Sequence, residues 1–134
     1  MSVLWDASFS VGIEAMDRQH RRILGLVSEL RERVEAHPGS PVPEEILSDL
    51  TRYALEHFQE EEALLARHGY PDLEGQAEEH RAFVREVAAQ CMGSFEPSGM
   101  VAGGLLTFLE GWWRHHILVT DMAYRDFLQA RGVR

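Results

Sequence analysis

The sequence predicts an all-α protein: an antiparallel up-down-up-down four-helix bundle with an irregular N-terminal arm. Apolar residues recur at alternating three- and four-residue steps in four long stretches, which is the spacing of amphipathic helices. Segments rich in glycine and proline separate these stretches, and short connections favour antiparallel neighbours. We expect a single domain over 1–134, made of an arm at 1–14 and helices at about 15–37, 43–68, 73–92 and 99–129.

The arm and the first helix follow from one continuous apolar pattern. Trp5, Phe9 and Ile13 are expected to tuck the arm against the bundle. The first helix then ends at the breaker segment 37–41, which contains two prolines and a glycine. Its apolar stripe consists of Ile13, Met16, Ile23, Val27, Leu30 and Val34.

The other three helices have stripes and ends of their own. Pro43 suits the first position of a helix, and Glu44 and Glu45 supply acids to its first turn. Gly69 followed by Pro71 is typical of a helix stop. The stripes are Leu50, Ala54 and Leu64 in the second helix; Leu73, Phe83, Val84 and Val87 in the third; and Val101, Leu105, Phe108, Trp112, Ala123 and Phe127 in the fourth.

Composition excludes several kinds of partner and site. The chain has 134 residues, with 13 Lys plus Arg against 22 Asp plus Glu and a net charge of −9. Nucleic acids and anionic membranes reward basic residues, so we expect neither as a partner. The single cysteine, Cys91, rules out an intrachain disulfide. No segment resembles a targeting peptide or a membrane span, so we expect a cytoplasmic protein.

Polar, coordinating side chains interrupt the apolar stripe of every helix. A buried carboxylate without a partner is strongly disfavoured, so these groups need one another or a cation. The interrupting residues are His20 in the first helix, His57 and Glu61 in the second, Gln76 and His80 in the third, and His116 and Asp121 in the fourth.

Counting from the loops places these residues at one height of the bundle. His20 lies 20 residues before residue 40, in the first loop, and Glu61 lies 21 after it. His80 lies 16 before residue 96, in the third loop, and His116 lies 20 after it. Equal counts from a turn mean equal heights in antiparallel helices, to within about one turn here. We therefore expect one layer near the second loop.

Spacing along each helix supports this layer. His57 and Glu61 are four residues apart and share a face. His116 and Asp121 are five apart, so either the carboxylate reaches across the offset or a π-bulge corrects it. A lone buried histidine is more often a satisfied core residue than a ligand, but convergence of four helices favours a metal site.

The remaining candidates are expected to lie at the surface. His37 and His68 fall at helix ends, and His115 points away from its neighbour His116. Glu60 and Glu62 flank Glu61 and are expected to face solvent.

The donor set indicates two metal ions. Imidazole with carboxylate suits iron, manganese or zinc. Four imidazoles and two carboxylates exceed one tetrahedral site, and paired iron or manganese is known in helical bundles. The Glu-x-x-His motif of carboxylate-rich diiron proteins is absent around these residues, which speaks against the oxygenase and ferritin type.

Taken together, the motifs resemble hemerythrin, specifically the bacterial single-domain kind, bacteriohemerythrin. The resemblance covers nearly the whole chain, in order and with matching spacings. The matching stretches are Trp5 with Val11-Gly12-Ile13; Asp17-Arg18-Gln19-His20; His57-Phe58-Gln59-Glu60-Glu61; Tyr70-Pro71 leading to His80; and Trp112-Trp113-Arg114-His115-His116-Ile117 followed by Asp121 and Tyr124.

The resemblance implies a cofactor of two iron ions joined by an oxo or hydroxo bridge, with manganese the less favoured metal. In the family, the iron with fewer histidine ligands keeps an open position, and dioxygen binds there reversibly in a dry apolar pocket. The implied iron ligands are His20 and His57 for one iron, His80 and His116 for the other, and Glu61 and Asp121 as bridges. The implied pocket residues are Ile23, Leu24, Phe58, Trp113 and Ile117.

One position departs from the family pattern. The family has a further histidine four residues before the one that matches His80, and here that residue is Gln76. The Gln76 amide could ligate the second iron, water could fill the position, or the second iron could be lost. The first two alternatives keep two irons but should favour oxidation over reversible binding.

Three functions remain open at this point. The favoured one is dioxygen binding for storage, transport or sensing. The alternative is a diiron oxidase or peroxidase enabled by Gln76, and the third is a metal store or a purely structural bundle. An enzyme is less favoured because no residue near the predicted pocket is suited to be a general acid. We expect a monomer, with a redox or signalling protein as a candidate partner.

Overall fold

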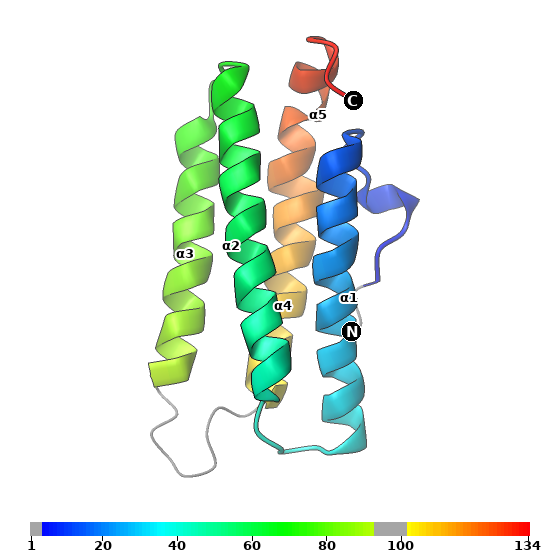
Figure 1. Ribbon diagram of the computed structural model, residues 1–134, viewed down its shortest axis with the longest axis vertical. Coiled ribbons are helices and arrows are strands. Elements are labelled where there is room, and N and C mark those ends of the chain that lie inside the picture. The colour runs from blue at the N-terminus through cyan, green and yellow to red at the C-terminus, as the bar shows by residue number, and fades with distance from the viewer. Residues whose placement is uncertain (1–3, 93–101) are drawn as a thin grey trace.

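The computed structural model describes residues 4–92 and 102–134, which form an antiparallel four-helix bundle (Figure 1). No β-strand occurs within these two ranges, and the predicted fold class is confirmed. The helices are α1, Glu14–Ala36; α2, Glu44–Arg67; α3, Leu73–Met92; and a fourth column of α4, Ala102–His115, the π-helix η2, His116–Asp121, and α5, Met122–Gln129. A short 3₁₀ helix, η1, spans Ala7–Phe9 in the arm.

Each helix packs against its neighbours in the order of an up-down-up-down bundle. Helix α1 contacts α2 and α4, while α3 contacts α2 and α4. In Figure 1 the connection from α1 to α2 lies at the lower end and the connection from α2 to α3 at the upper end. The predicted third loop at 93–99, and the predicted start of the fourth helix at residue 99, fall outside the described residues.

The turn between α2 and α3 is closed by a glycine in the left-handed region. Gly69 has φ of 70°, which L-residues with a Cβ rarely adopt. Its N–H donates to the Ala66 carbonyl at 3.2 Å, and the next N–H, of Tyr70, donates to the Leu65 carbonyl at 2.9 Å. This pair of bonds is the Schellman arrangement that ends a helix. The chain therefore reverses at the end of the bundle where the polar layer was expected.

The N-terminal arm is fastened to α1 through Asp17. The Asp17 carboxylate accepts from the Val11 N–H at 2.9 Å and from the Ser10 hydroxyl at 2.6 Å. Phe9 and Val11 are buried in the core, and Trp5 packs against it while partly exposed. The arm therefore covers one side of the bundle near the start of α1.

Replacing Asp17 by alanine is expected to destabilise the protein by about 1–3 kcal/mol, because the Val11 N–H would stay buried without an acceptor. Chemical denaturation of the variant and the wild type measures this difference. Glu14→Ala, an exposed acid in the same turn, is the matched control and is expected to stay within about 0.5 kcal/mol of the wild type. Equal stability of all three proteins would show that the arm is not held by Asp17.

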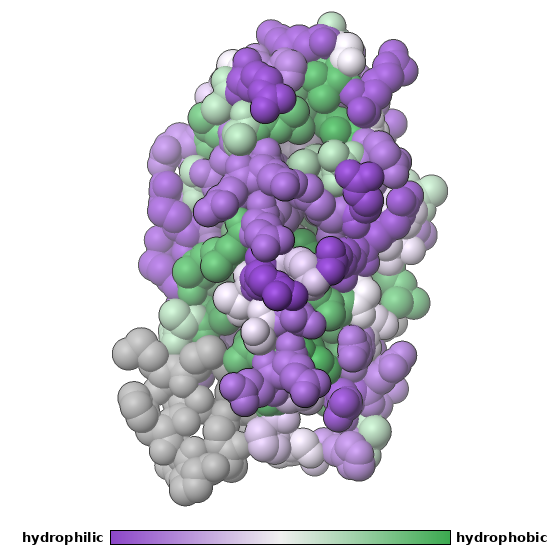
Figure 2. All heavy atoms as spheres, viewed as in Figure 1, coloured by the Kyte–Doolittle hydropathy of each residue, from purple (hydrophilic) through white to green (hydrophobic). Residues whose placement is uncertain are grey.

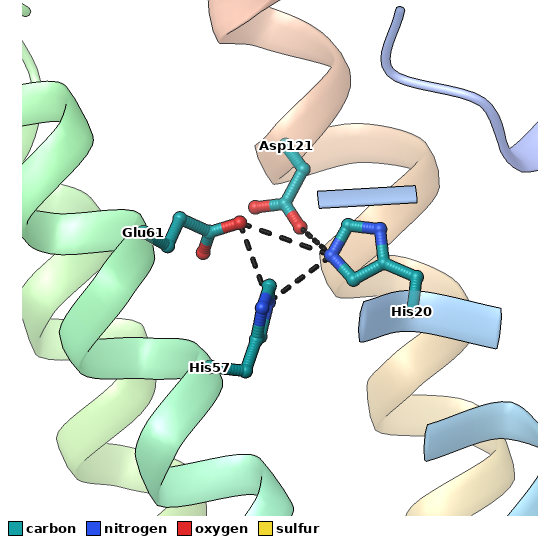
Figure 3. Close-up of side chains that lie close together, drawn as sticks. All are labelled: His20, His57, Glu61 and Asp121. Carbon is teal, nitrogen blue, oxygen red and sulfur yellow. Dashed lines mark hydrogen bonds and ion pairs between the residues drawn. The ribbon is translucent and has the colours of Figure 1, made fainter. Parts of the chain in front are cut away.

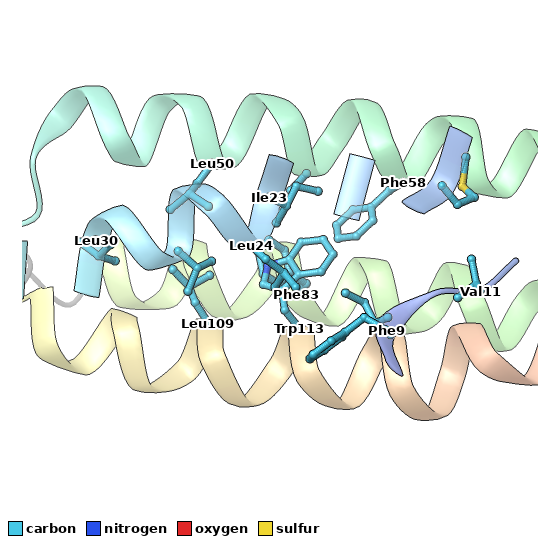
Figure 4. Packing of buried hydrophobic residues seen from close by; sticks show 14 of the residues in the cluster. Phe9, Val11, Ile23, Leu24, Leu30, Leu50, Phe58, Phe83, Leu109 and Trp113 are labelled. Atoms are coloured by element: carbon cyan, nitrogen blue, oxygen red, sulfur yellow. The ribbon is translucent and has the colours of Figure 1, made fainter. Parts of the chain in front are cut away.

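Apolar side chains fill the bundle and polar ones cover it. Figure 4 shows residues of all four helices meeting along the axis, among them Leu24, Phe58 and Trp113. Figure 2 shows hydrophilic side chains over much of one face, with smaller hydrophobic patches among them. In the described part of the chain no helix is both long and apolar enough to cross a membrane.

Candidate metal centre

Four coordinating side chains from three helical columns meet in the core, as Figure 3 shows. His20 comes from α1, His57 and Glu61 from α2, and Asp121 from the end of η2. Their ligand atoms all lie within 4.8 Å of one another. His20 Nε2 lies 3.1 Å from His57 Nε2 and 3.2 Å from Asp121 Oδ2. We call these four residues the first cluster.

A second cluster shares Glu61 with the first and adds one histidine from α3 and one from η2. Glu61 Oε1 lies 2.9 Å from His80 Nε2 and 3.4 Å from His116 Nε2. The two imidazole nitrogens are 3.3 Å apart. All three side chains are buried. The structure thus brings the four predicted imidazoles and both predicted carboxylates into two adjoining groups.

Both carboxylates face both clusters. Glu61 turns Oε2 toward the His57 Nε2 of the first cluster, at 3.4 Å, and Oε1 toward the second. Asp121 turns Oδ2 toward the first cluster and Oδ1 toward His116 Nε2, at 3.2 Å. A carboxylate with one oxygen toward each of two sites is the arrangement that bridges a metal pair.

The π-helix η2 aligns the fourth column with this layer. His116 and Asp121 are its first and last residues. A π-helix has a wider turn than an α-helix, with backbone hydrogen bonds between residues i and i+5, so two side chains five apart point in more similar directions than they would in an α-helix. Of the two alternatives left open for this spacing, the structure has the local change of helix rather than a long reach by the carboxylate.

Protons compensate the buried carboxylates when no cation does. Burial lowers the pKa of His20, but hydrogen bonds to Asp121 and Glu61 outweigh it and raise that pKa to about 9. Burial also opposes protonation of His116, but the charge of Asp121 and the bond to Glu61 raise its pKa to about 10. Burial raises the pKa of Glu61, yet the surrounding imidazoles hold it well below its usual range. Two imidazolium groups then balance two carboxylates.

The metal-free protein is therefore expected to lose stability at alkaline pH. The folded-state pKa values of His20 and His116 lie above the ordinary 6.5, so their contribution is complete below pH 6.5. It is lost as the pH rises through about 9 to 10, at roughly 1.4 kcal/mol per unit of pKa shift at most. Glu61 acts in the opposite sense and loses its contribution as the pH falls well below 4.5.

Thermal unfolding in the presence of a chelator, from pH 6 to pH 10, measures this loss as a falling Tm. The chain contains no lysine, so no lysine ammonium group contributes to the loss near pH 10. Protein loaded with metal is the control and should keep its Tm, because a cation replaces the two protons. A metal-free Tm that stays level across the window would contradict this account of the charge balance.

Three of the four imidazoles are held from behind by side chains that sequence reasoning did not assign to the site. The Nδ1–H of His80 donates to Glu62 Oε2 at 2.8 Å, and that of His116 donates to Glu79 Oε1 at 2.7 Å. His57 Nδ1 lies 2.6 Å from the amide oxygen of Gln19. Such outer partners fix the tautomer, so that Nε2 is free to face inward.

The expectation that Glu62 only faces solvent is wrong in part. Its side chain is 37% exposed, yet one oxygen accepts from His80. The sequence offers one indication of these outer partners, because Gln19, Glu62 and Glu79 are each next to a predicted ligand. Tyr124, noted in the resemblance only as part of a motif, donates its hydroxyl to Glu61 Oε2 at 2.8 Å.

Gln76 is buried beside the second cluster. Its Nε2 donates to Asp121 Oδ1 at 3.0 Å and to the Thr120 carbonyl at 3.3 Å. Its amide oxygen is buried without a hydrogen-bond partner, which costs about 1–3 kcal/mol. A cation or a water molecule at that oxygen would remove this cost. The unpaired amide oxygen of Gln76 therefore fits the first two alternatives, in which the amide binds the second iron or a water molecule occupies the position.

The five residues predicted to line a ligand pocket are buried among the same helices. Phe58 stacks on the His80 ring with centroids 4.0 Å apart, and Trp113 stacks on Phe58 at 5.6 Å. Ile23, Leu24 and Ile117 are also buried. A surface hollow of about 380 Å³ between α2 and α3 is lined in part by Phe58 and His80.

The other three histidines stay away from the layer. His37 and His115 are exposed and His68 is half-buried at the end of α2. The fold and the donor set together define a metal-binding four-helix-bundle protein with a buried centre of histidine and carboxylate ligands.

Comparison with known proteins identifies the family. A model of the hemerythrin HHE cation binding domain matches residues 11–128. A bacteriohemerythrin of Stenotrophomonas maltophilia is 29% identical over 96% of this chain and 82% of its own length. A bacteriohemerythrin of Pseudomonas aeruginosa is 27% identical, over 92% and 80%. A hemerythrin-like protein of Naegleria gruberi is 28% identical over 92% of each chain. The chain belongs to the hemerythrin family, which confirms the resemblance seen in its motifs.

Proposed function

We propose that this protein holds two iron ions in the two clusters and binds dioxygen reversibly there. The observation that carries the proposal is the pair of carboxylates, Glu61 and Asp121, that each turn one oxygen toward each cluster. A single metal ion, or a purely hydrogen-bonded core, gives no reason for both carboxylates to face both clusters. Two adjoining cations bridged by Glu61 and Asp121 would use the oxygens that face each cluster.

Each residue has a defined part in this proposal. His20 and His57 hold one iron, while His80 and His116 hold the other. The bridging carboxylates offset the repulsion between the two cations. A pair of ferrous ions supplies the two electrons that reversible binding of dioxygen requires, and the chain supplies position and a dry environment.

The surroundings of the centre favour binding over turnover. The rings of Phe58 and Trp113 and the branched side chains of Ile23 and Ile117 are buried and exclude water from the core. A dry pocket disfavours dissociation into a charged oxygen species, because the separated ion would lie in the pocket without hydration. The Tyr124 hydroxyl is committed to Glu61, which fixes that carboxylate.

A second candidate function is a diiron oxidase or peroxidase, and Gln76 is the residue that favours it. An amide is a weaker donor than an imidazole, and the Gln76 amide group also donates to Asp121. The second iron is then less saturated with strong donors than in a relative with histidine there. Such a centre is expected to oxidise more readily.

Anaerobic reconstitution with ferrous iron, followed by oxygen, tests both functions. Two irons per chain, and optical bands of a bridged diferric pair that reverse on removal of oxygen, are expected for binding. Catalytic consumption of peroxide with a reductant would favour the enzyme instead. One zinc per chain, or a colourless product, would contradict the proposal. Metal analysis of protein isolated from its native cells distinguishes iron from manganese.

A further inference from the structure

The two histidine pairs differ in what stands behind their rings. In the second cluster both imidazoles donate Nδ1–H to a carboxylate: His80 to Glu62, and His116 to Glu79. In the first cluster His57 faces the neutral amide of Gln19. The Nδ1 atom of the fourth imidazole, His20, is buried without a hydrogen-bond partner.

The Glu79 carboxylate is itself held in place. The Thr120 hydroxyl lies 2.8 Å from each of its oxygens, and the side chain is only 25% exposed. Thr120 belongs to the same π-helix as His116. The helix that presents the imidazole therefore also anchors the carboxylate behind it.

A carboxylate behind an imidazole strengthens it as a ligand. The accepted hydrogen bond makes the far nitrogen more basic, and the negative charge attracts the cation through the ring. Loss of such an outer partner typically weakens metal binding about 10- to 100-fold. Two of them stand behind the half of the centre that contains Gln76, where the family's additional histidine is missing.

We propose that Glu62 and Glu79 are positioning residues that secure the second metal and compensate for Gln76. This inference rests on the proposed two-metal function. It implies that metal binding by the second cluster depends on its outer carboxylates. Metal binding by the first cluster does not, because an amide stands behind His57. Neither glutamate touches the metal; each acts through its histidine.

Metal titration of the variant Glu62→Gln/Glu79→Gln tests this inference. Glutamine keeps the shape and removes both charges. Titration with ferrous iron without oxygen gives stoichiometry and affinity, and Co²⁺ reports the same sites by its visible absorption. The second metal is expected to bind about 10- to 100-fold more weakly than in the wild type, with the first unchanged.

The matched control is Glu56→Gln/Glu78→Gln. It removes the same charge from exposed positions on the same two helices. Among the described side chains, neither Glu56 nor Glu78 contacts a cluster histidine or one of the outer partners, so this control should bind both metals as the wild type does. Circular dichroism of the metal-free proteins checks that all of them fold.

Adding Gln76→His to the test variant separates compensation from a structural role. If the glutamates compensate for the missing imidazole, the added histidine restores tight binding of the second metal. Wild-type affinity in Glu62→Gln/Glu79→Gln, or no recovery with the added histidine, overturns this inference alone. A wild type that binds fewer than two metals overturns the proposed function as well.

Discussion

Replacing Glu61 by glutamine is expected to abolish tight binding at both metal positions. Glu61 belongs to both clusters: Oε2 faces His57, and Oε1 faces His80 and His116. An amide of the same shape carries no charge and cannot bridge two cations. Because an outer partner already accounts for about 10- to 100-fold in affinity, loss of the bridge should cost at least the upper end of that range.

Metal per chain after anaerobic loading and dialysis measures this effect. On the proposed function, the wild type should retain about two ions per chain, and Glu61→Gln should retain almost none. Glu56→Gln, which changes an exposed acid on the same helix, is the control and should behave as the wild type does. Retention of two ions by Glu61→Gln would mean that the shared carboxylate does not bridge.

Replacing Gln76 by histidine is expected to tighten the second iron and slow autoxidation. An imidazole is a stronger donor than an amide oxygen and would saturate that iron. The change also removes the donation from Gln76 to Asp121 and to the Thr120 carbonyl. We expect the stronger ligand to outweigh the lost hydrogen bonds, with iron affinity raised by about one order of magnitude, comparable to the effect of an outer partner.

The decay of the oxygenated optical bands, followed together with iron content, measures autoxidation. Gln59→His is the matched control, since it adds a histidine at an exposed position of α2. The control should decay at the wild-type rate, and Gln76→His should decay more slowly. Equal iron content and equal decay in all three proteins would make Gln76 irrelevant to the chemistry.

The helices and their order could be predicted because the information is local. A stripe at helical spacing identifies each helix, and proline or glycine marks its ends, as Pro43 and Gly69 do for α2. The height of each inward-facing polar residue follows from a count along a helix of fixed rise. Hence the convergence of His20 and His116 on one layer was predictable without coordinates.

The alignment of His116 with Asp121 was not predictable in the same way. Five residues in an α-helix place side chains on different faces, and the sequence allowed two remedies. The structure has a π-helix there. The poorer backbone hydrogen bonding of a π-helix is offset here by the contacts that His116 and Asp121 make in the metal centre. Those contacts are a property of the packed centre and not of the six residues alone.

The chain alone determined which residues can bind metal, because residue type and helical phase decide which polar groups face inward. Only the tertiary structure decided which atom meets which. It turned one oxygen of Glu61 toward each cluster and placed Glu62 and Glu79 behind two of the histidines. These contacts depend on helix rotation, helix separation and side-chain rotamers, which spacing along the chain does not encode. A displacement of about 1 Å is enough to change them.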